Sequence, residues 1–225
     1  SVIPNLLHHR GSAFVIDVKP ELHAVTARRR RELGQRVVCI DPFAEVGGQD
    51  ACNPMDWIDV HGPDALDDAD MIADMCVAIG ERSKTDEHWN EEGLALLTGL
   101  ILHVKTTAPP ELQHLPYVRR QLMLPGGIGR KKGPFDVLLR DMLRNHAVHN
   151  LIHQRAAAIL QKASPERSGV ISAVQAHTHF LSSPRMSVLK RSTFDFADLK
   201  RGSLTVFLVL PAKRLRRYNR FLRLM

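Results

Sequence analysis

Apolar and polar positions at the start of the chain follow the pattern of a strand, a helix and a second strand. Residues 12–18 (SAFVIDV) are apolar on consecutive positions up to Asp17, which is typical of a strand covered on both faces in a parallel sheet. Residues 21–34 (ELHAVTARRRRELG) have helical character, and residues 35–43 (QRVVCIDPF) predict a second short strand. A parallel β-α-β crossover is the most economical interpretation.

The predicted helix has a start and a stop signal. Pro20 restricts Lys19 to an extended or turn conformation and can itself occupy the first helical turn. Gly34 is suited to cap the carboxyl end. The apolar positions that we expect to be buried along this helix are Leu22, Val25 and Leu33.

After Asn53 and Pro54 helical periodicity replaces strand patterns for about 150 residues. Residues 66–81 (LDDADMIADMCVAIGE) predict an amphipathic helix with acidic residues near its start. Its apolar stripe comprises Ala69, Ile72, Met75, Cys76 and Ile79. Residues 89–104 predict a second helix, apolar over most of its surface and therefore central in the packing.

Further helices follow a loop. Residues 124–134 (LPGGIGRKKGP) predict the loop from their glycine and proline content. Residues 135–160 predict one long helix, with Leu138, Met142, Ile152 and Ile159 near one face. The next helix is expected to have Ser164 as its N-cap and Pro165 and Glu166 in its first turn.

The strand pattern returns near the end of the chain. Residues 204–211 (LTVFLVLP) predict a strand buried on both faces, and residues 213–225 (KRLRRYNRFLRLM) predict the start of a basic amphipathic helix. The order of elements predicts an α/β fold with an inserted all-α domain. We therefore expect an α/β part over 1–54, an all-α insertion over 55–190 and a continuation of the α/β part over 191–225.

The amino-acid composition indicates a globular protein but does not identify its partner. With 225 residues, 44% of them hydrophobic, the chain can bury a sizeable core. Lys and Arg outnumber Asp and Glu by 31 to 24, which suits a nucleic-acid or anionic-membrane partner but also ordinary solubility. Three cysteines without a C-x-x-C pair indicate neither a disulfide framework nor a zinc knuckle. The start at Ser without a leader and the end at Met225 predict a chain cut from a longer protein.

Several separated stretches, taken together and in this order, resemble the conjugative coupling proteins of type IV secretion, the TraG/TraD class. They are SVIPNLL, GSAFVIDVKPEL, VVCIDPF, NPMDWI, HWNEEGLALLTGLI, FDFADLKRGSLTVFLVLP and RFLRLM. In that family the phosphate loop lies just before VIPNLL, and the acidic strand that completes the ATP site follows RLM. The resemblance therefore implies the segment between the two nucleotide motifs.

The resemblance also implies a fold and a function. The fold would be a partial RecA-like P-loop NTPase sheet with an inserted all-α domain. Family members are similar to hexameric ATPases, anchored on the cytoplasmic face of the bacterial inner membrane by a segment with no counterpart here. They receive relaxase-bound DNA, single-stranded or double-stranded, or protein substrates from the relaxosome, and deliver them to the secretion channel. ATP and Mg²⁺ belong to the intact protein, and we expect neither to bind this chain alone.

The sequence itself also lacks the motif that a phosphate loop requires. Holding ATP requires a glycine-rich loop at a helix start with a Lys for the phosphates, yet no G-x-x-x-x-G-K-[ST] occurs in the 225 residues. The glycine-rich stretch at 126–133 (GGIGRKKG) follows no strand, so an exposed basic loop is the better interpretation. No Ser-His-Asp or Cys-His arrangement can be argued, since Cys39 lies in a predicted buried strand, where a thiol is inert.

Three charged residues follow the first strand. Asp17, Lys19 and Glu21 resemble the D-x-K-G-E turn of the family, with Pro20 in place of glycine. Ligands of open α/β sheets bind at the carboxyl edge, where this turn is expected. The residues either flank the nucleotide or a neighbouring subunit's site, or they form a solvated turn.

Two arginine groups are candidate contacts to nucleic acid or to a neighbouring subunit. The first comprises Arg28, Arg29, Arg30 and Arg31, and the second comprises Arg214, Arg216, Arg217 and Arg220. Because four consecutive helical positions span every face, some of the first group must face the sheet or a partner. The alternative for both groups is a solvated helix face with ordinary packing.

Histidines cluster twice in the sequence. His146, His149 and His153 fall on one face if 135–160 is a single helix, and His177 and His179 lie further on. Without H-E-x-x-H they favour structural roles over metal ligation.

Two functions compete with the coupling ATPase. They are a stand-alone, non-catalytic interaction module on a degenerate nucleotide-binding scaffold, and non-specific DNA binding by the basic surface.

Overall fold

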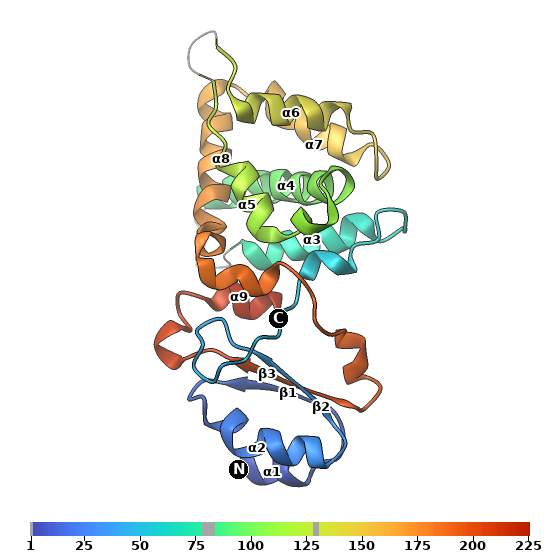
Figure 1. Cartoon of the computed structure of the whole chain (residues 1–225). Coiled ribbons are helices and arrows are strands. Elements are labelled where there is room, and N and C mark those ends of the chain that lie inside the picture. The colour runs from blue at the N-terminus through green and yellow to red at the C-terminus, as the bar shows by residue number, and fades with distance from the viewer. Residues whose placement is uncertain (1, 78–83, 128–130) are drawn as a thin grey trace. The chain divides into compact units, whose positions relative to one another are not determined.

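The computed structural model describes residues 2–77, 84–127 and 131–225, which form two compact units (Figure 1). The first, called the sheet unit, comprises Ser1–Asn53 and Arg185–Asn219. The second, called the helical unit, comprises Pro54–Pro184 and Arg220–Met225. The prediction for Ile79 lies outside the described residues, as does the middle of the glycine-rich stretch, residues 128–130.

A parallel sheet organises the first unit. Its described strands are β1 (Ala13–Asp17), β2 (Arg36–Ile40) and β3 (Leu204–Val209), in the order β1-β3-β2. Because β3 pairs with both others, the strand from the far end of the chain lies in the middle (Figure 1). Every residue of β3 is buried, so the prediction of a strand covered on both faces is confirmed there.

Two helices accompany this sheet. The helix α1 (Val2–His8) packs against α2 (Glu21–Glu32), which in turn lies against β1 and β2. The shared core contains Leu6, Val15, Ala27, Cys39, Phe207 and Val209. The helix α2 ends at Leu33 and Gly34, whose φ of 85° favours glycine, as the sequence predicts. Short 3₁₀ turns complete the unit: η4 (Pro184–Leu189), η5 (Phe196–Leu199) and η6 (Ala212–Arg214).

Two expectations for this unit are wrong. One face of β1 is open, because Phe14 is 38% exposed and Ile16 is 44% exposed. Val25 is 53% exposed and does not pack inward. The buried face of α2 instead consists of Thr26, Ala27 and Arg30. Small side chains bring this face close to the sheet, and the next helical turn supplies a buried arginine rather than an aliphatic residue.

The helical unit is built around one long helix. Its first elements are η1 (Pro54–Trp57), α3 (Ala65–Cys76), α4 (Lys84–Thr107), η2 (Pro110–Leu112) and α5 (Leu115–Leu122). Its later elements are α6 (Pro134–Arg144), α7 (Leu151–Gln161), α8 (Ser164–His177), η3 (His179–Ser182) and α9 (Asn219–Leu224). The helix α4 contacts α3, α5, α6, α7 and α8, and the central position predicted for it is confirmed.

Three boundaries differ from the sequence prediction. The segment 135–160 is not one helix, because the chain turns between α6 and α7, where Val148, His149 and Asn150 have φ of 50°, 52° and 68°. Ser164 is the first residue of α8 rather than its cap. The basic stretch after residue 212 begins with the 3₁₀ turn η6, and α9 starts only at Asn219. Among the described helices, none has the length and apolarity that crossing a bilayer requires.

Candidate functional site

Asp17 is a buried carboxylate at the carboxyl edge of the sheet. It is the last residue of β1, it pairs in register with Val209, and its exposed fraction is 0%. Its Oδ2 atom accepts a hydrogen bond of 2.8 Å from the backbone N–H of His23. Its Oδ1 atom is buried and has no hydrogen-bond partner among the described residues. A buried acceptor without a donor is costly, so the arrangement is suited to receive a donor or a cation.

The neighbours of Asp17 in sequence do not join it in one cluster. Lys19 and Glu21 are exposed, whereas Asp17 is fully buried. Between them Pro20 has a φ of 28°, in the region that glycine favours and far from the roughly −65° of an unstrained proline. Pro20 therefore has a backbone conformation typical of glycine, and it occupies the position at which the D-x-K-G-E turn carries glycine.

His23, whose backbone N–H binds Asp17, packs its ring against the sheet. It meets the ring of Phe207 edge to face, with 5.2 Å between centroids. Burial is the main cause that lowers the pKa of His23, and the positive charge of Arg31 acts in the same direction. Asp17 and Asp41 oppose this shift without reversing it.

Two further carboxylates lie after β2, and sequence analysis did not single them out. Asp41 is 5% exposed and accepts hydrogen bonds from the backbone N–H groups of Glu45, Val46 and Gly47. Asp50 accepts from the backbone N–H of Cys39 at 2.8 Å. Both carboxylates are therefore engaged in holding the loop after the strand. The Asp-Pro step at the strand end was the only sequence signal for them.

Few groups in the part of the chain that the structure describes are suited to hold ATP or Mg²⁺. The sequence contains no phosphate-loop motif, and the described residues contain no group of three or more His, Cys, Asp or Glu placed to hold a metal. The thiol of Cys39 is also unsuited to chemistry, because burial, followed by the charges of Asp41 and Asp50, raises its pKa to about 12. At this edge only Asp17 offers an unengaged buried oxygen among the described residues.

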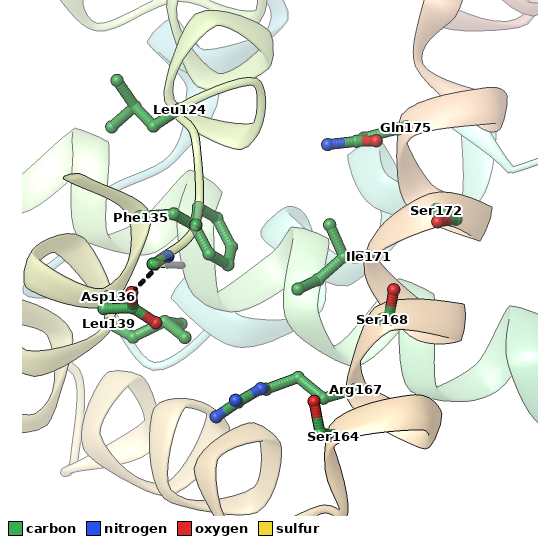
Figure 2. A pocket seen from close by; sticks show the side chains of 12 residues that line it. Leu124, Phe135, Asp136, Leu139, Ser164, Arg167, Ser168, Ile171, Ser172 and Gln175 are labelled. Atoms are coloured by element: carbon green, nitrogen blue, oxygen red, sulfur yellow. Dashed lines mark hydrogen bonds between the residues drawn. The ribbon is translucent and has the colours of Figure 1, made fainter. Parts of the chain in front are cut away.

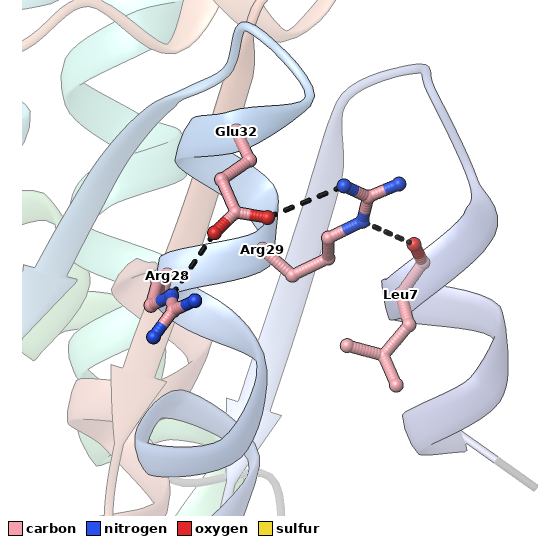
Figure 3. A network of polar contacts seen from close by, with 4 residues as sticks. All are labelled: Leu7, Arg28, Arg29 and Glu32. Atoms are coloured by element: carbon pink, nitrogen blue, oxygen red, sulfur yellow. Dashed lines mark hydrogen bonds and ion pairs between the residues drawn. The ribbon is translucent and has the colours of Figure 1, made fainter.

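The first arginine group divides into different environments. Arg28 and Arg29 share the carboxylate of Glu32 at 3.0 Å and 3.2 Å, and Arg29 also donates to the carbonyl of Leu7 (Figure 3). Arg31 is exposed. Arg30, by contrast, is fully buried and makes hydrogen bonds within the sheet unit, so it cannot contact a partner.

The second group is spread along the chain. The guanidinium of Arg214 lies over the ring of Phe43, 5.6 Å from its centroid, while Arg216 and Arg217 are exposed. Arg220 belongs to the helical unit, where burial lowers its pKa and its Nη2 lies 3.4 Å from Nδ1 of His177. Three members of this group therefore belong to the sheet unit and the fourth to the helical unit.

The predicted histidine face does not exist as such, because His146 and His149 lie in the turn before α7 and His153 lies within α7. The rings of His146 and His153 nevertheless stack, with 5.2 Å between centroids. Nδ1 of His153 lies 2.5 Å from the carbonyl oxygen of Leu143, and Nδ1 of His146 lies 2.7 Å from Oδ1 of Asn150. These contacts describe a structural cluster that holds α7 against the end of α6.

A cleft of about 340 Å³ opens in the helical unit (Figure 2). One wall is formed by the chain after α5 and the start of α6, and the other by α8. Its lining residues are Leu124, Gly126, Gly127, Phe135, Asp136, Leu139, Ser164, Arg167, Ser168, Ile171, Ser172 and Gln175. No sequence signal marks this site, because its two walls are about 25 to 50 residues apart and neither carries a motif.

Curated relatives resemble this chain over nearly its whole length. The conjugal transfer protein TraG of Agrobacterium fabrum is 26% identical over 216 residues, which cover 94% of this chain and 31% of that protein. The type IV secretion system-coupling protein VirD4 of Bartonella henselae is 23% identical over 224 residues, covering 97% and 34%. The chain thus spans about a third of the length of these relatives.

Solved structures share the fold. The bacterial conjugative coupling protein TrwB matches with a TM-score of 0.55 at 12% identity, over 96% of this chain and 49% of that one. A plasmid coupling protein TrwB in complex with the non-hydrolysable GTP analogue GDPNP matches with a TM-score of 0.54 at 14% identity, over 99% and 52%. These matches confirm the partial RecA-like α/β fold with a helical insertion.

A sequence model of one protein family matches every position of the chain. The family is described as Type IV secretory system Conjugative DNA transfer, and the match covers residues 1–225. The resemblance seen in the separated sequence stretches is therefore confirmed. The chain belongs to the type IV secretory system conjugative DNA transfer family.

Proposed function

We propose that this chain is part of a coupling protein that links ATP hydrolysis to the transfer of relaxase-bound DNA, or of protein substrates, into a type IV secretion channel. The observation that carries the proposal is the family match over residues 1–225. Because the chain spans about a third of its curated relatives, the whole protein would supply the phosphate loop, the acidic strand and a membrane anchor. It would act as a homohexamer at the cytoplasmic face of the inner membrane.

The sheet unit is proposed to border the nucleotide. Ligands of open parallel sheets bind beyond the carboxyl ends of the strands, which is where Asp17, Lys19 and Glu21 lie. The unengaged Oδ1 of Asp17 supports the assignment, as does the GDPNP complex of the structurally similar TrwB. ATP and Mg²⁺ would be held mainly by residues outside this chain, and the 225 residues alone should neither bind nor hydrolyse ATP appreciably.

The helical unit is proposed to receive the partners, namely the relaxosome with its relaxase or secreted protein substrates. The cleft beside α8 supports this role, because it offers a recessed surface of mixed chemistry. The insertion that we propose as the docking domain is the predicted span 55–190. For DNA, single-stranded or double-stranded, and for subunit contacts, the candidates are the arginines that are not buried, whereas buried Arg30 is not one. They are Arg28, Arg29, Arg31, Arg214, Arg216, Arg217 and the half-buried Arg220.

Genetic complementation tests the proposal. A donor strain that lacks its coupling-protein gene should regain plasmid transfer with the full-length gene, and lose it again with the full-length Asp17→Asn variant. Purified full-length protein should hydrolyse ATP, and the variant should hydrolyse it more slowly. Transfer restored by a gene for residues 1–225 alone would instead favour the non-catalytic interaction module.

A further inference from the structure

We propose that the cleft beside α8 binds an extended peptide segment that carries one carboxylate side chain next to an aliphatic one. The inference deepens the proposed docking role of the helical unit and rests on it for its place in transfer. It names a site, a chemistry and a residue, Arg167, that sequence analysis did not assign. The chemistry follows from the charge, the depth and the shape of the cleft.

The described lining of the cleft contains one cation, Arg167, and one anion, Asp136. Arg167 is half-buried on α8, and its guanidinium makes no ion pair or hydrogen bond with any residue that the structure describes. The Oδ2 atom of Asp136 accepts from the backbone N–H groups of Gly127 at 2.7 Å and Gly133 at 2.8 Å, so this carboxylate is held at the start of α6 and forms no ion pair with Arg167. A guanidinium that pairs with no described carboxylate is suited to a carboxylate ligand, which it can bind through two parallel N–H groups.

The floor of the cleft is apolar. Phe135 is 4% exposed, and Leu139 beneath it is almost fully buried. Figure 2 shows Ile171 pointing from α8 toward Phe135 across the opening, while Arg167 reaches from one turn earlier toward the side that carries Leu139. An aliphatic side chain of the bound peptide could be buried between Phe135, Leu139 and Ile171, away from water. The carboxylate on the neighbouring peptide residue would then contact Arg167.

The rim can hydrogen-bond a peptide backbone. Ser164, Ser168 and Ser172 follow one another at four-residue intervals along α8, and Gln175 ends the row. Such spacing places the hydroxyls on one helix face, about 6 Å apart, which is close to the two-residue repeat of an extended chain. A volume of about 340 Å³ lies in the range of known ligand pockets and admits two or three residues.

Nucleic acid fits this cleft less well than a peptide. Binding to a phosphate backbone draws on several cations at once, whereas the described lining contains a single cation, Arg167. The apolar floor has no counterpart in a phosphate, and base stacking would require an exposed aromatic face, which the buried Phe135 does not present.

The direct test is a titration of the 225-residue chain with a defined probe. The probe is the capped peptide acetyl-Gly-Leu-Glu-Leu-Gly-amide, and its control is the same peptide with Gln in place of Glu. Amide and methyl NMR spectra should show saturable shifts centred on Arg167 and Ile171 for the Glu peptide. The Gln peptide should bind roughly tenfold more weakly, because it loses the charge-assisted hydrogen bonds.

Matched variants separate charge from packing. Arg167→Ala should weaken the Glu peptide by about tenfold without changing the affinity for the Gln peptide. Arg144→Ala is the control, because that arginine is exposed on α6 and pairs only with nearby Asp141 among the described residues. Ile171→Ala should weaken both peptides by roughly threefold through lost apolar contact. A thermal unfolding curve confirms that each variant is folded.

Three results would overturn the inference. They are equal binding of the two peptides, shifts that map away from α8, and a short oligothymidylate that binds at Arg167 while the Glu peptide does not. The full-length protein keeps this test apart from the test of the proposed function. If wild-type full-length protein supports transfer and Arg167→Ala transfers equally well, the cleft proposal fails and the coupling function stands. If the wild type supports no transfer, the peptide titration still decides the cleft.

Discussion

The Nε atom of Arg30 donates a hydrogen bond of 2.9 Å to the hydroxyl of Thr205, across 175 residues of sequence. The same guanidinium donates to the backbone carbonyls of Leu6, His9 and Gly11. One buried side chain on α2 therefore ties together α1, the turn before β1 and the middle strand β3. The expectation that some residues of Arg28 to Arg31 face the sheet or a partner is therefore met by Arg30, which cross-links the sheet unit.

Replacing Arg30 should destabilise the chain severely. Arg30→Ala leaves three carbonyls and a hydroxyl without their buried donor, so we expect a loss of about 3 kcal/mol or more in the free energy of unfolding. Arg28→Ala is the matched control, because the Arg28 side chain is 91% exposed and its ion pair with Glu32 lies at the surface, where it should contribute little to stability. Urea denaturation of both variants measures the difference, and equal midpoints would refute the cross-link.

Asp17→Asn should separate stability from function. The amide keeps an acceptor for the N–H of His23 and costs less to bury than a carboxylate without a donor, so the chain should gain about 1 kcal/mol. ATP hydrolysis by the full-length variant should fall at the same time. The exposed Asp67→Asn serves as the control for both measurements. A strong loss of stability would mean that Asp17 has a structural role instead.

Gly99→Ala tests the closeness of α4 and α7. A Cβ at this position would lie 2.8 Å from Cβ of Arg155, an atom next to the backbone that cannot turn aside. The helices must then separate, and we expect a net loss of about 1 to 2 kcal/mol despite the better helix propensity of alanine. At Gly126 an added Cβ meets no atom within 4 Å, so Gly126→Ala should leave the melting temperature nearly unchanged.

The cysteines should be unreactive in the folded chain. Burial raises the pKa of Cys39 and of Cys76 to about 12, and Cys52 is also buried. At about pH 8 a thiol with such a pKa is ionised in roughly one molecule in ten thousand, and the thiolate is the reactive form. Alkylation followed by mass spectrometry should label none of the three before unfolding and all three in urea. Rapid labelling of native Cys39 would show that its strand opens.

Stability should fall as the solution is acidified below about pH 6.5. Burial is the main cause that lowers the pKa of His23, His103 and His177, and the charge of Arg220 adds to the shift at His177. The unfolded chain then binds more protons than the folded one as the pH drops, so stability present above the unfolded pKa is lost. Denaturation at about pH 7.5 and 5.5 measures this, and His177→Gln should reduce the loss. Equal stability at both values would contradict it.

Elements that depend on residues adjacent in the sequence could be predicted from the sequence. The apolar run of β3 and the nearly all-round apolar surface of α4 report burial directly, since no tertiary partner has to be known. Gly34 likewise predicts the end of α2, because glycine readily adopts the positive φ that a helix end requires. These elements follow from periodicity and capping alone, and the ordered set of stretches was enough to suggest the family.

What the sequence could not reveal depends on distant partners. Arg30 is buried because Thr205 and three carbonyls receive it, and none of them adjoins it in the chain. The break between α6 and α7 rests on left-handed residues such as Val148, whose own propensities oppose that conformation. The cleft beside Arg167 arises only when α6 and α8 are placed side by side.

The position of β3 has a consequence for biosynthesis. A ribosome makes β1 and β2 first and β3 more than 160 residues later, yet in the described sheet β1 and β2 each pair with β3 and not with each other. The two early strands must therefore wait with unpaired edges while the helices between them and β3 emerge. Unpaired strand edges are prone to aggregate, so we expect slow release or a chaperone to protect the nascent chain until β3 arrives.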